Sequence, residues 1–228
     1  MDLEDFLTKL DENPVAALDE YRLEVTEVGL DVVKGTGEDW VETGFRQIDV
    51  AFDDTTTPGT YAVRPATMSD SHRNTLCIWY LPWKRSTSGA KVAGLAKADL
   101  DGTGPGIFLT SRLNGCRFTL QFHSGADTNV TVLHVAGDLG EGLGGHKTRE
   151  VAETAGLTGV PGSNPRRYSI GKIGPRFKTQ LLSTGTGTRS YYDGNAATVI
   201  GVRGRDRKWK FFAQQYGDLQ GGPMTKTL

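Results

Sequence analysis

The sequence predicts an α+β fold in which a β-sandwich core carries a few helices. Short segments that alternate apolar and polar residues, the pattern of half-buried strands, recur along most of the chain. The 30 glycines and 9 prolines supply the turns that many short strands need. Near the N-terminus, by contrast, residues 3–21 have the apolar spacing of amphipathic helices.

The helical segment has two starts. The apolar residues of its first half share one face, and Asn13-Pro14 then begins a second helix, because proline is well tolerated in the first turn. A further short helix is expected at residues 147–156. Residues 76–81 are almost continuously apolar, which predicts a strand buried on both faces. The other expected strands are 21–28, 45–52, 60–63, 107–113, 116–123, 130–136, 177–182, 188–192, 197–202 and 208–216.

The most informative stretch is a predicted hairpin formed by residues 116–123 and 130–136. Cys116 falls on the apolar face of the first strand, and His134 falls on the apolar face of the second. An even register sum across the hairpin puts both residues on one face, whereas a slip of one residue separates them. The apolar patterns of the two strands favour the first register. His123 falls on the opposite, polar face.

A thiol beside an imidazole on rigid strands suits nucleophilic catalysis, because the thiolate attacks and the imidazole transfers the proton. The plain alternative makes Cys116 a small core residue and His134 a hydrogen-bonded core histidine. That alternative is the commoner one for an arbitrary pair, so the surrounding residues have to decide between the two.

Two motifs and one threonine surround the pair. Thr110 lies six residues before Cys116. The motifs are Leu81-Pro82-Trp83-Lys84 and Leu113-Asn114-Gly115-Cys116.

This pattern resembles the cysteine-dependent glutamine deamidases of the cytotoxic necrotizing factor and chemoreceptor glutamine deamidase superfamily. The toxins of the Burkholderia lethal factor type are most similar, with Leu-Pro-Trp-Lys and Leu-Ser-Gly-Cys motifs in the same order. The matching segments span roughly residues 76–137. Asn114 stands in place of the motif serine, and the segment between Cys116 and His134 is longer than in those toxins.

The resemblance implies a single deamidase-like domain over residues 1–228, with the β-sandwich of the cytotoxic necrotizing factor catalytic domain. It also implies a protein-glutamine amidohydrolase that converts a specific glutamine of a host protein to glutamate through a thioester. Cys116 and His134 form the nucleophile and its ion-paired imidazole, and Thr110 orients the ring with its hydroxyl or its carbonyl. The candidates for oxyanion or substrate contacts are Asn114, Gly115, Trp83 and Lys84.

Other functions stay open on the sequence alone. A transglutaminase uses the same thioester but transfers it to an amine, and a cysteine peptidase is disfavoured because its Cys-Gly-x-Cys-Trp type of signature is missing. A non-catalytic β-sandwich binding module would use its glycine-rich loops for recognition. From the residues alone, Trp83 is expected to pack in the core and Lys84 to be a solvated charge.

Composition narrows the partners and ligands. The net charge of −1, with both signs interleaved, argues against direct nucleic-acid binding. No apolar run approaches the ~20 residues that span a bilayer, and no His/Cys spacing typical of a metal site occurs, so we expect neither membrane insertion, nor a metal, nor another cofactor.

The resemblance also bears on partners and location. It implies a host protein as substrate, such as a translation-initiation RNA helicase or a Rho-type GTPase, and inhibition of host translation as one outcome. We expect a monomer. The acidic first residues lack the features of a cleavable signal, and two cysteines without a disulfide framework suit a reducing compartment. The expected locations are the bacterial cytoplasm before export and then the host cytosol.

Overall fold

The chain contains three helices and fourteen strands in the part described by the computed structural model. None of these helices is long and apolar enough to cross a membrane. The described residues are 2–25, 46–71, 74–82, 95–113, 116–123, 127–136, 145–157, 166–173, 178–183, 187–190, 196–215 and 225–227.

Two short helices open the chain, α1 (Leu3–Glu12) and α2 (Pro14–Glu20). The carboxylate of Asp2 accepts hydrogen bonds from two backbone N–H groups in the first turn of α1, at 3.0 and 3.2 Å. The side chain of Asn13 caps α2 in the same way at 3.2 Å. The two helices predicted within residues 3–21 are therefore confirmed.

The larger sheet has eight strands in the order β1-β3-β2-β4-β6-β12-β13-β14. The pairs β1–β3 and β4–β6 are parallel, and the other neighbouring pairs are antiparallel. Its strands are β1 (Arg22–Val25), β2 (Arg46–Asp54), β3 (Thr60–Pro65), β4 (Thr75–Leu81), β6 (Ile107–Thr110), β12 (Ala197–Arg203), β13 (Trp209–Gln215) and β14 (Thr225–Thr227).

The smaller sheet has six antiparallel strands in the order β11-β10-β9-β7-β8-β5. The expected strands 197–202 and 208–216 pair as the hairpin β12–β13 in the larger sheet, whereas the predicted Cys–His hairpin, β7–β8, lies within the smaller one. The strands of the smaller sheet are β5 (Leu95–Leu100), β7 (Arg117–Phe122), β8 (Val130–Val135), β9 (Arg166–Ile173), β10 (Lys178–Ser183) and β11 (Gly187–Ser190).

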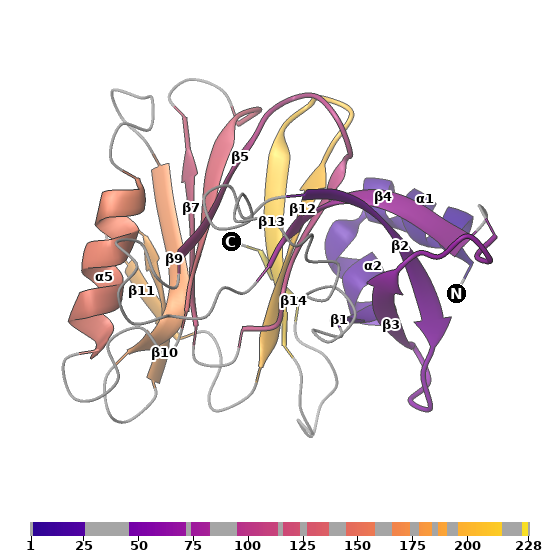
Figure 1. Ribbon diagram of the computed structural model, residues 1–228, viewed down its shortest axis with the longest axis horizontal. Helices are drawn as coiled ribbons and strands as arrows, with labels where there is room; N and C mark the ends of the chain where they lie inside the picture. Colours follow the sequence, from indigo (N-terminus) through magenta and orange to yellow (C-terminus); the bar gives the residue numbers. More distant parts are fainter. Residues whose placement is uncertain are drawn as a thin grey trace.

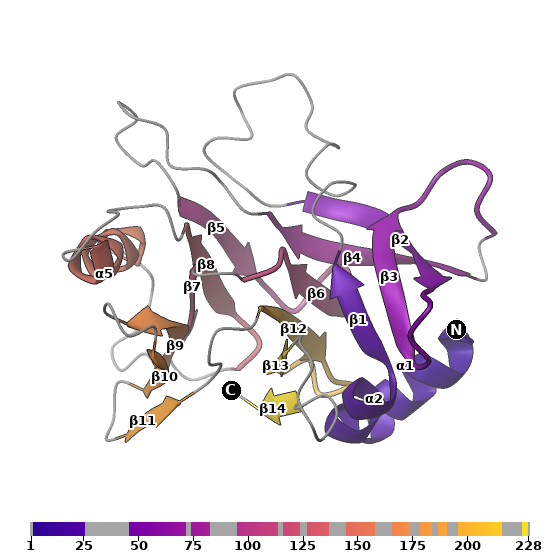
Figure 2. The same ribbon diagram turned by 90° about the horizontal axis from the view of Figure 1, so that it is seen from below.

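The two sheets pack face to face, with helices on both outer faces (Figures 1 and 2). The core between the sheets combines residues of β6, β12 and β13 with residues of β5, β7 and β8. Helices α1 and α2 cover the outer face of the larger sheet. Helix α5 (Gly145–Gly156) covers the outer face of the smaller one. The predicted α+β class, with helices on a core of strands, is confirmed.

Strand β7 is buried on both faces, which corrects the prediction of a half-buried strand. All six of its residues are buried, including the polar residues on the face away from the sandwich core. Helix α5 contributes to this burial at one end, because Glu153 of α5 forms a buried ion pair with Arg117 at the start of β7. The apolar residues of the same layer are Leu95, Leu133, Val135 and Leu157.

Strand β4 departs from its prediction in the other direction. The apolar run at 76–81 predicted burial on both faces, yet Cys77 is exposed and Leu76 is only half-buried. Only the second half of the strand, which runs beside β6, reaches the core between the sheets, where Leu81 is fully buried. Burial therefore increases along β4 from Leu76 to Leu81.

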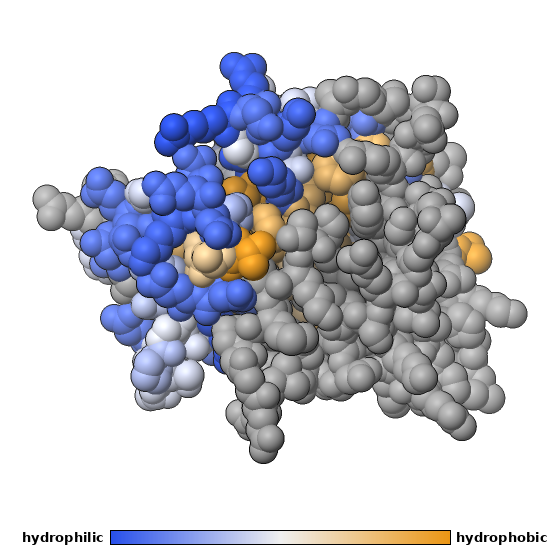
Figure 3. Space-filling model, turned by 180° about the vertical axis from the view of Figure 1, so that it is seen from behind, coloured by the Kyte–Doolittle hydropathy of each residue, from blue (hydrophilic) through white to orange (hydrophobic). Residues whose placement is uncertain are grey.

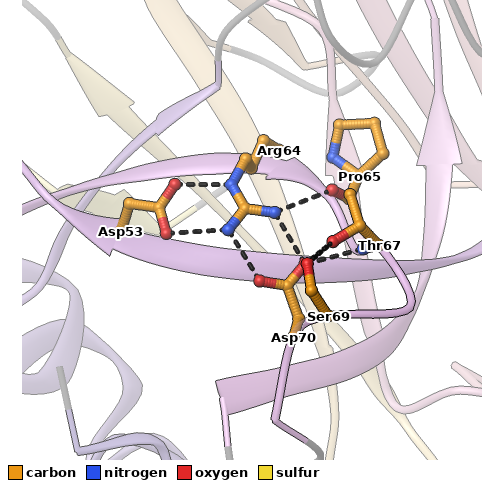
Figure 4. Close-up of polar contacts among 6 residues, drawn as sticks. All are labelled: Asp53, Arg64, Pro65, Thr67, Ser69 and Asp70. Carbon is orange, nitrogen blue, oxygen red and sulfur yellow. Dashed lines mark hydrogen bonds and ion pairs between the residues drawn. The ribbon is translucent and has the colours of Figure 1, made fainter.

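An ionic cluster fixes the turn after β3 (Figure 4). The guanidinium of Arg64 contacts the carboxylate of Asp53 at 2.5 and 3.1 Å and the carboxylate of Asp70 at 2.8 Å twice. Asp70 also accepts hydrogen bonds from the backbone N–H and the hydroxyl of Thr67. Arg64 thus ties β2 and β3 to the turn whose tip carries the exposed Met68.

Hydrophilic side chains dominate the described surface over the N-terminal half in Figure 3. The exposed side of α1 agrees with this view, since Glu4, Asp5, Asp11 and Glu12 all face solvent. Met68 and Val151 are the large hydrophobic side chains exposed in the described part of the chain, and they lie on separate elements.

Candidate active site

Cys116 lies where the chain crosses from the larger sheet to the smaller one. Strand β6 ends at Thr110, Leu113 then bridges to Ala197 of β12, and β7 begins at Arg117. The thiol is therefore placed just before β7 rather than within it. Only 3% of Cys116 is exposed, and the residue belongs to the core between the sheets.

His134 lies on β8 of the same hairpin, and the two strands pair in the predicted register. Phe118 of β7 lies opposite His134 of β8, so the register sum is even. Cys116 lies two residues before Phe118 and packs in the same core cluster, which puts the thiol diagonally across from His134 on one face. Diagonal neighbours in such a pair lie about 7–8 Å apart, a spacing that aromatic and long side chains can span. The predicted register is confirmed.

His123 lies on the other face of the hairpin, as predicted. Its Nε2 atom is 2.9 Å from the hydroxyl oxygen of Thr131. Thr131 donates its own hydroxyl proton to the carboxylate of Asp99 on β5. The Thr131 oxygen therefore accepts from Nε2–H of His123, which makes this ring a donor on the outer face and separates it from the thiol.

The imidazole of His134 has one hydrogen-bonded nitrogen and one without a partner. Nδ1 is 3.2 Å from the hydroxyl oxygen of Ser111, and both side chains are buried. Nε2 has no hydrogen-bond partner among the described residues. Ser111 itself is held to the larger sheet by a 2.9 Å hydrogen bond from its backbone N–H to the carbonyl of Leu81. The Ser111–His134 bond thus joins the two sheets.

Burial controls the charge of His134. The ring is fully enclosed, and desolvation lowers the pKa of His134 to about 3. The neutral imidazole is therefore the form that this site favours near neutral pH. The ion pair of thiolate and imidazolium expected from the sequence is disfavoured in this enclosed state, because the charged ring has lost its hydration.

The hydroxyl of Thr110 does not contact His134, which corrects one of the two roles expected for this residue. Its oxygen accepts a 3.1 Å hydrogen bond from the backbone N–H of Val199, and Thr110 is fully buried. The hydroxyl thus continues the β6–β12 ladder beyond the last paired residues. The neighbouring Ser111, missed from the sequence, makes the contact with the ring. A role for the Thr110 carbonyl stays a prediction.

The two sequence motifs around the hairpin meet in space. Leu81 of β4 pairs with Thr110 of β6 in the parallel ladder, and its carbonyl accepts from Ser111. Leu81 and Pro82 are both buried at this point. The other expected contacts, Trp83, Lys84, Asn114 and Gly115, lie outside the described residues.

The second cysteine lies away from this cluster. Cys77 is exposed on β4, opposite Asp49 of β2. Partial desolvation, followed by the charge and hydrogen bond of Asp49, raises the pKa of the Cys77 thiol. No group of three or more His, Cys, Asp or Glu side chains in the described part of the chain is arranged to hold a metal ion.

Comparison with known proteins adds no assignment to this site. No protein-family model matches the sequence, and no curated protein matches it.

Proposed function

We propose that the protein is a cysteine-dependent glutamine deamidase that acts on a folded protein. One observation carries the proposal: the register of the β7–β8 hairpin puts Cys116 and His134 on the same face, with Nε2 of the ring unpartnered. A thiol and a buried imidazole on one face of a hairpin, with one ring nitrogen unpartnered, supply the two groups that a nucleophile and its base require. The pairing of Leu81 with Thr110 also brings together two of the segments on which the family resemblance depends.

The proposed chemistry starts from the neutral pair. Nε2 of His134 takes the thiol proton of Cys116 as the sulfur attacks the amide carbon of a glutamine side chain. The imidazolium then protonates the departing nitrogen, so ammonia leaves and a thioester forms. A water molecule, deprotonated by the same nitrogen, hydrolyses the thioester and restores the thiol, with glutamate as product. The backbone N–H of Cys116 is the expected oxyanion donor.

The low pKa of His134 shapes this mechanism. An imidazole that resists protonation is a weak base toward a thiol, so the pair is poorly active while it is enclosed. Proton transfer becomes easier when the developing thiolate and imidazolium form together, because each neutralises the charge of the other. Substrate binding that admits polar groups to this face therefore belongs to the mechanism. Asn114, Gly115, Trp83 and Lys84 stay the expected contacts.

The proposed substrate and setting follow the family resemblance. The chain is then a bacterial effector or toxin whose single deamidase-like domain works in the host cytosol. Its substrate is a host protein, with a translation-initiation RNA helicase or a Rho-type GTPase as first candidates. Deamidation would add one negative charge to that protein, and in the helicase case translation would be inhibited.

The burial of the pair favours a second candidate, a non-catalytic β-sandwich module. Only 3% of Cys116 and 1% of His134 are exposed. In this interpretation the thiol fills the core, and the Ser111–His134 bond only ties the sheets together. A transglutaminase remains a variant of the first candidate, since it uses the same thioester.

Mass spectrometry of a treated host-cell lysate tests the proposal. Wild-type protein should raise the mass of a target peptide by about 1 Da and release ammonia, because an amide becomes an acid. The Cys116→Ser protein should do neither. If the target peptide instead gains the mass of an added primary amine, less the mass of the released ammonia, the protein is a transglutaminase. Equal peptide masses with wild-type and Cys116→Ser protein would leave the binding module as the function.

A further inference from the structure

The hydrogen bond between Ser111 and His134 can exist in two chemical forms. In the first, the serine hydroxyl donates to a bare Nδ1, and the ring proton sits on Nε2. In the second, Nδ1–H donates to the serine oxygen, and Nε2 is bare. The 3.2 Å distance fits both forms. The two forms make opposite chemical agents of Nε2, a donor in the first and a base in the second.

The surroundings of Nε2 favour the second form. In the first form a buried N–H group points at no acceptor among the described residues. A buried N–H donor without an acceptor is rare and costly, whereas an under-used acceptor is tolerated more often. In the second form Nε2 is such an acceptor, and the same face of the hairpin holds Cys116 without a hydrogen bond between the two.

We infer that Ser111 is a positioning residue: by accepting from Nδ1–H it holds His134 in the tautomer with a bare Nε2. The serine can do this because its backbone is bonded to Leu81 and its side chain is fully enclosed. The ring is held from the larger sheet while its own strand belongs to the smaller one. Neither the orientation nor the tautomer is then left to the hairpin alone.

The consequence for catalysis rests on the proposed function. When Nε2 takes the thiol proton, the imidazolium carries two N–H groups, and Nδ1–H is already bonded to the oxygen of Ser111. No reorientation is needed during the proton transfer. The positive charge meets an oxygen dipole that is in place beforehand, which is the usual role of the third group in a catalytic triad.

Nitrogen NMR of the histidine side chains tests the tautomer without any substrate. We expect the ¹⁵N-labelled wild-type protein to show His134 with a protonated Nδ1 and a bare Nε2. A His134→Gln spectrum assigns the signals by their loss. A wild-type ring protonated on Nε2 would overturn the inference, whatever the activity of the protein.

Two substitutions at Ser111 test the cause. Ser111→Ala should give a mixture of tautomers, and alkylation of Cys116 by iodoacetamide should slow about 10-fold, as for the loss of an orienting hydrogen bond. Ser111→Thr, which keeps the hydroxyl, should restore both. All rates are measured with Cys77→Ser in the background, because Cys77 is exposed. An unchanged tautomer and alkylation rate in Ser111→Ala would sink the inference.

Thr110→Val is the matched control, since it removes the adjacent buried hydroxyl that bonds Val199 instead. It should lower stability and leave the tautomer as in wild type. A shift of the tautomer in Thr110→Val as large as in Ser111→Ala would refute a specific role of Ser111. Wild-type protein with the expected tautomer but no ammonia release supports this inference and rejects the proposed function. If Ser111→Ala does not fold, the wild-type tautomer alone decides.

Discussion

The guanidinium of Arg117 and the carboxylate of Glu153 form an ion pair in which both side chains are about 5% exposed. Arg117 is the first residue of β7, directly after Cys116, and Glu153 lies on α5. The pair therefore anchors the start of the strand that follows the proposed nucleophile. It does so from the outer face of the smaller sheet, opposite to the face of the thiol.

Removal of one partner of this pair should be strongly destabilising. Arg117→Ala leaves the carboxylate of Glu153 buried without the guanidinium, and such losses cost about 3–5 kcal/mol. Urea unfolding of the variant measures the change. The double variant Arg117→Met with Glu153→Leu should recover most of the loss, because apolar residues of similar volume often replace a buried pair. Unchanged stability of Arg117→Ala would show that the pair is not a tether.

The two cysteines should separate activity from stability. Cys116→Ser should abolish deamidation while the fold is kept, because a serine hydroxyl is a far weaker nucleophile than a thiol beside this imidazole. Cys77→Ser should retain deamidation, since Cys77 is exposed and lies in the first half of β4, away from the buried end at Leu81. Ammonia release and circular dichroism on both variants give the comparison. Loss of activity in Cys77→Ser alone would move the nucleophile to β4.

Acid should destabilise the protein through His134. In the unfolded chain a histidine has a pKa of about 6.5, whereas burial lowers the pKa of His134 to about 3 in the folded protein. Between these values the unfolded chain binds more protons, so the free energy of unfolding falls as the pH falls. The loss between about pH 6.5 and about pH 5 is on the order of 2 kcal/mol for this group.

Urea unfolding across that range tests the effect. His134→Gln should show a much weaker loss of stability with acid, even if it is less stable overall. His123→Gln, changed on the other face of the hairpin, should retain the acid sensitivity of wild type. Parallel pH profiles of wild type and His134→Gln would mean that the ring is not held neutral by burial.

The turn after β3 should loosen when Asp70 loses its charge. Arg64 first, then Thr67, lowers the pKa of the Asp70 carboxyl well below its usual range. The charged carboxylate therefore stabilises the folded protein at pH values above the ordinary pKa of an aspartate. This contribution is lost as the pH falls from there through the lowered pKa of the folded state. Asp70→Asn should speed proteolysis of the segment 66–71 and amide exchange at Thr67.

Asp53→Asn is the control for that variant, because Asp53 contacts Arg64 but no residue of the turn. It should leave the exchange of Thr67 nearly unchanged. Equal effects of the two substitutions would mean that the turn depends on the orientation of Arg64 rather than on Asp70.

The hairpin register could be predicted because both strands carry an apolar face that only one pairing aligns. With Cys116, Phe118 and His134 on that face, a one-residue slip would have moved the whole set away from the core between the sheets. The burial of Arg117 on the opposite face of β7 could not be predicted, since its partner Glu153 lies on a helix that begins at Gly145. Polar residues on a strand indicate solvent only when no other layer covers them.

The hydrogen-bond partner of His134 could not be predicted from local sequence patterns either. Ser111 and His134 belong to different sheets, so their contact depends on how the sheets pack and not on any spacing along the chain. Thr110 and Ser111 are adjacent hydroxyl residues in the predicted strand 107–113. Nothing in the sequence around them indicates which hydroxyl contacts the ring. The strand Arg166–Ile173 is not among the predicted strands, because the two arginines at its start indicate exposed charge.

Gln214 connects the two ends of the chain. Its side-chain oxygen accepts from the backbone N–H of Leu23 at 2.7 Å, and its nitrogen donates to carbonyls of Leu18 and Tyr21. Helices α1 and α2 also pack on β12 and β13. During synthesis the N-terminal helices can meet β2 early, since Phe6 of α1 packs near Phe52, but the hydrogen bonds to Gln214 form only when almost the whole chain is present. Such long-range closure slows folding, because the last bonds that fix α2 and β1 join residues 196 and 191 positions apart.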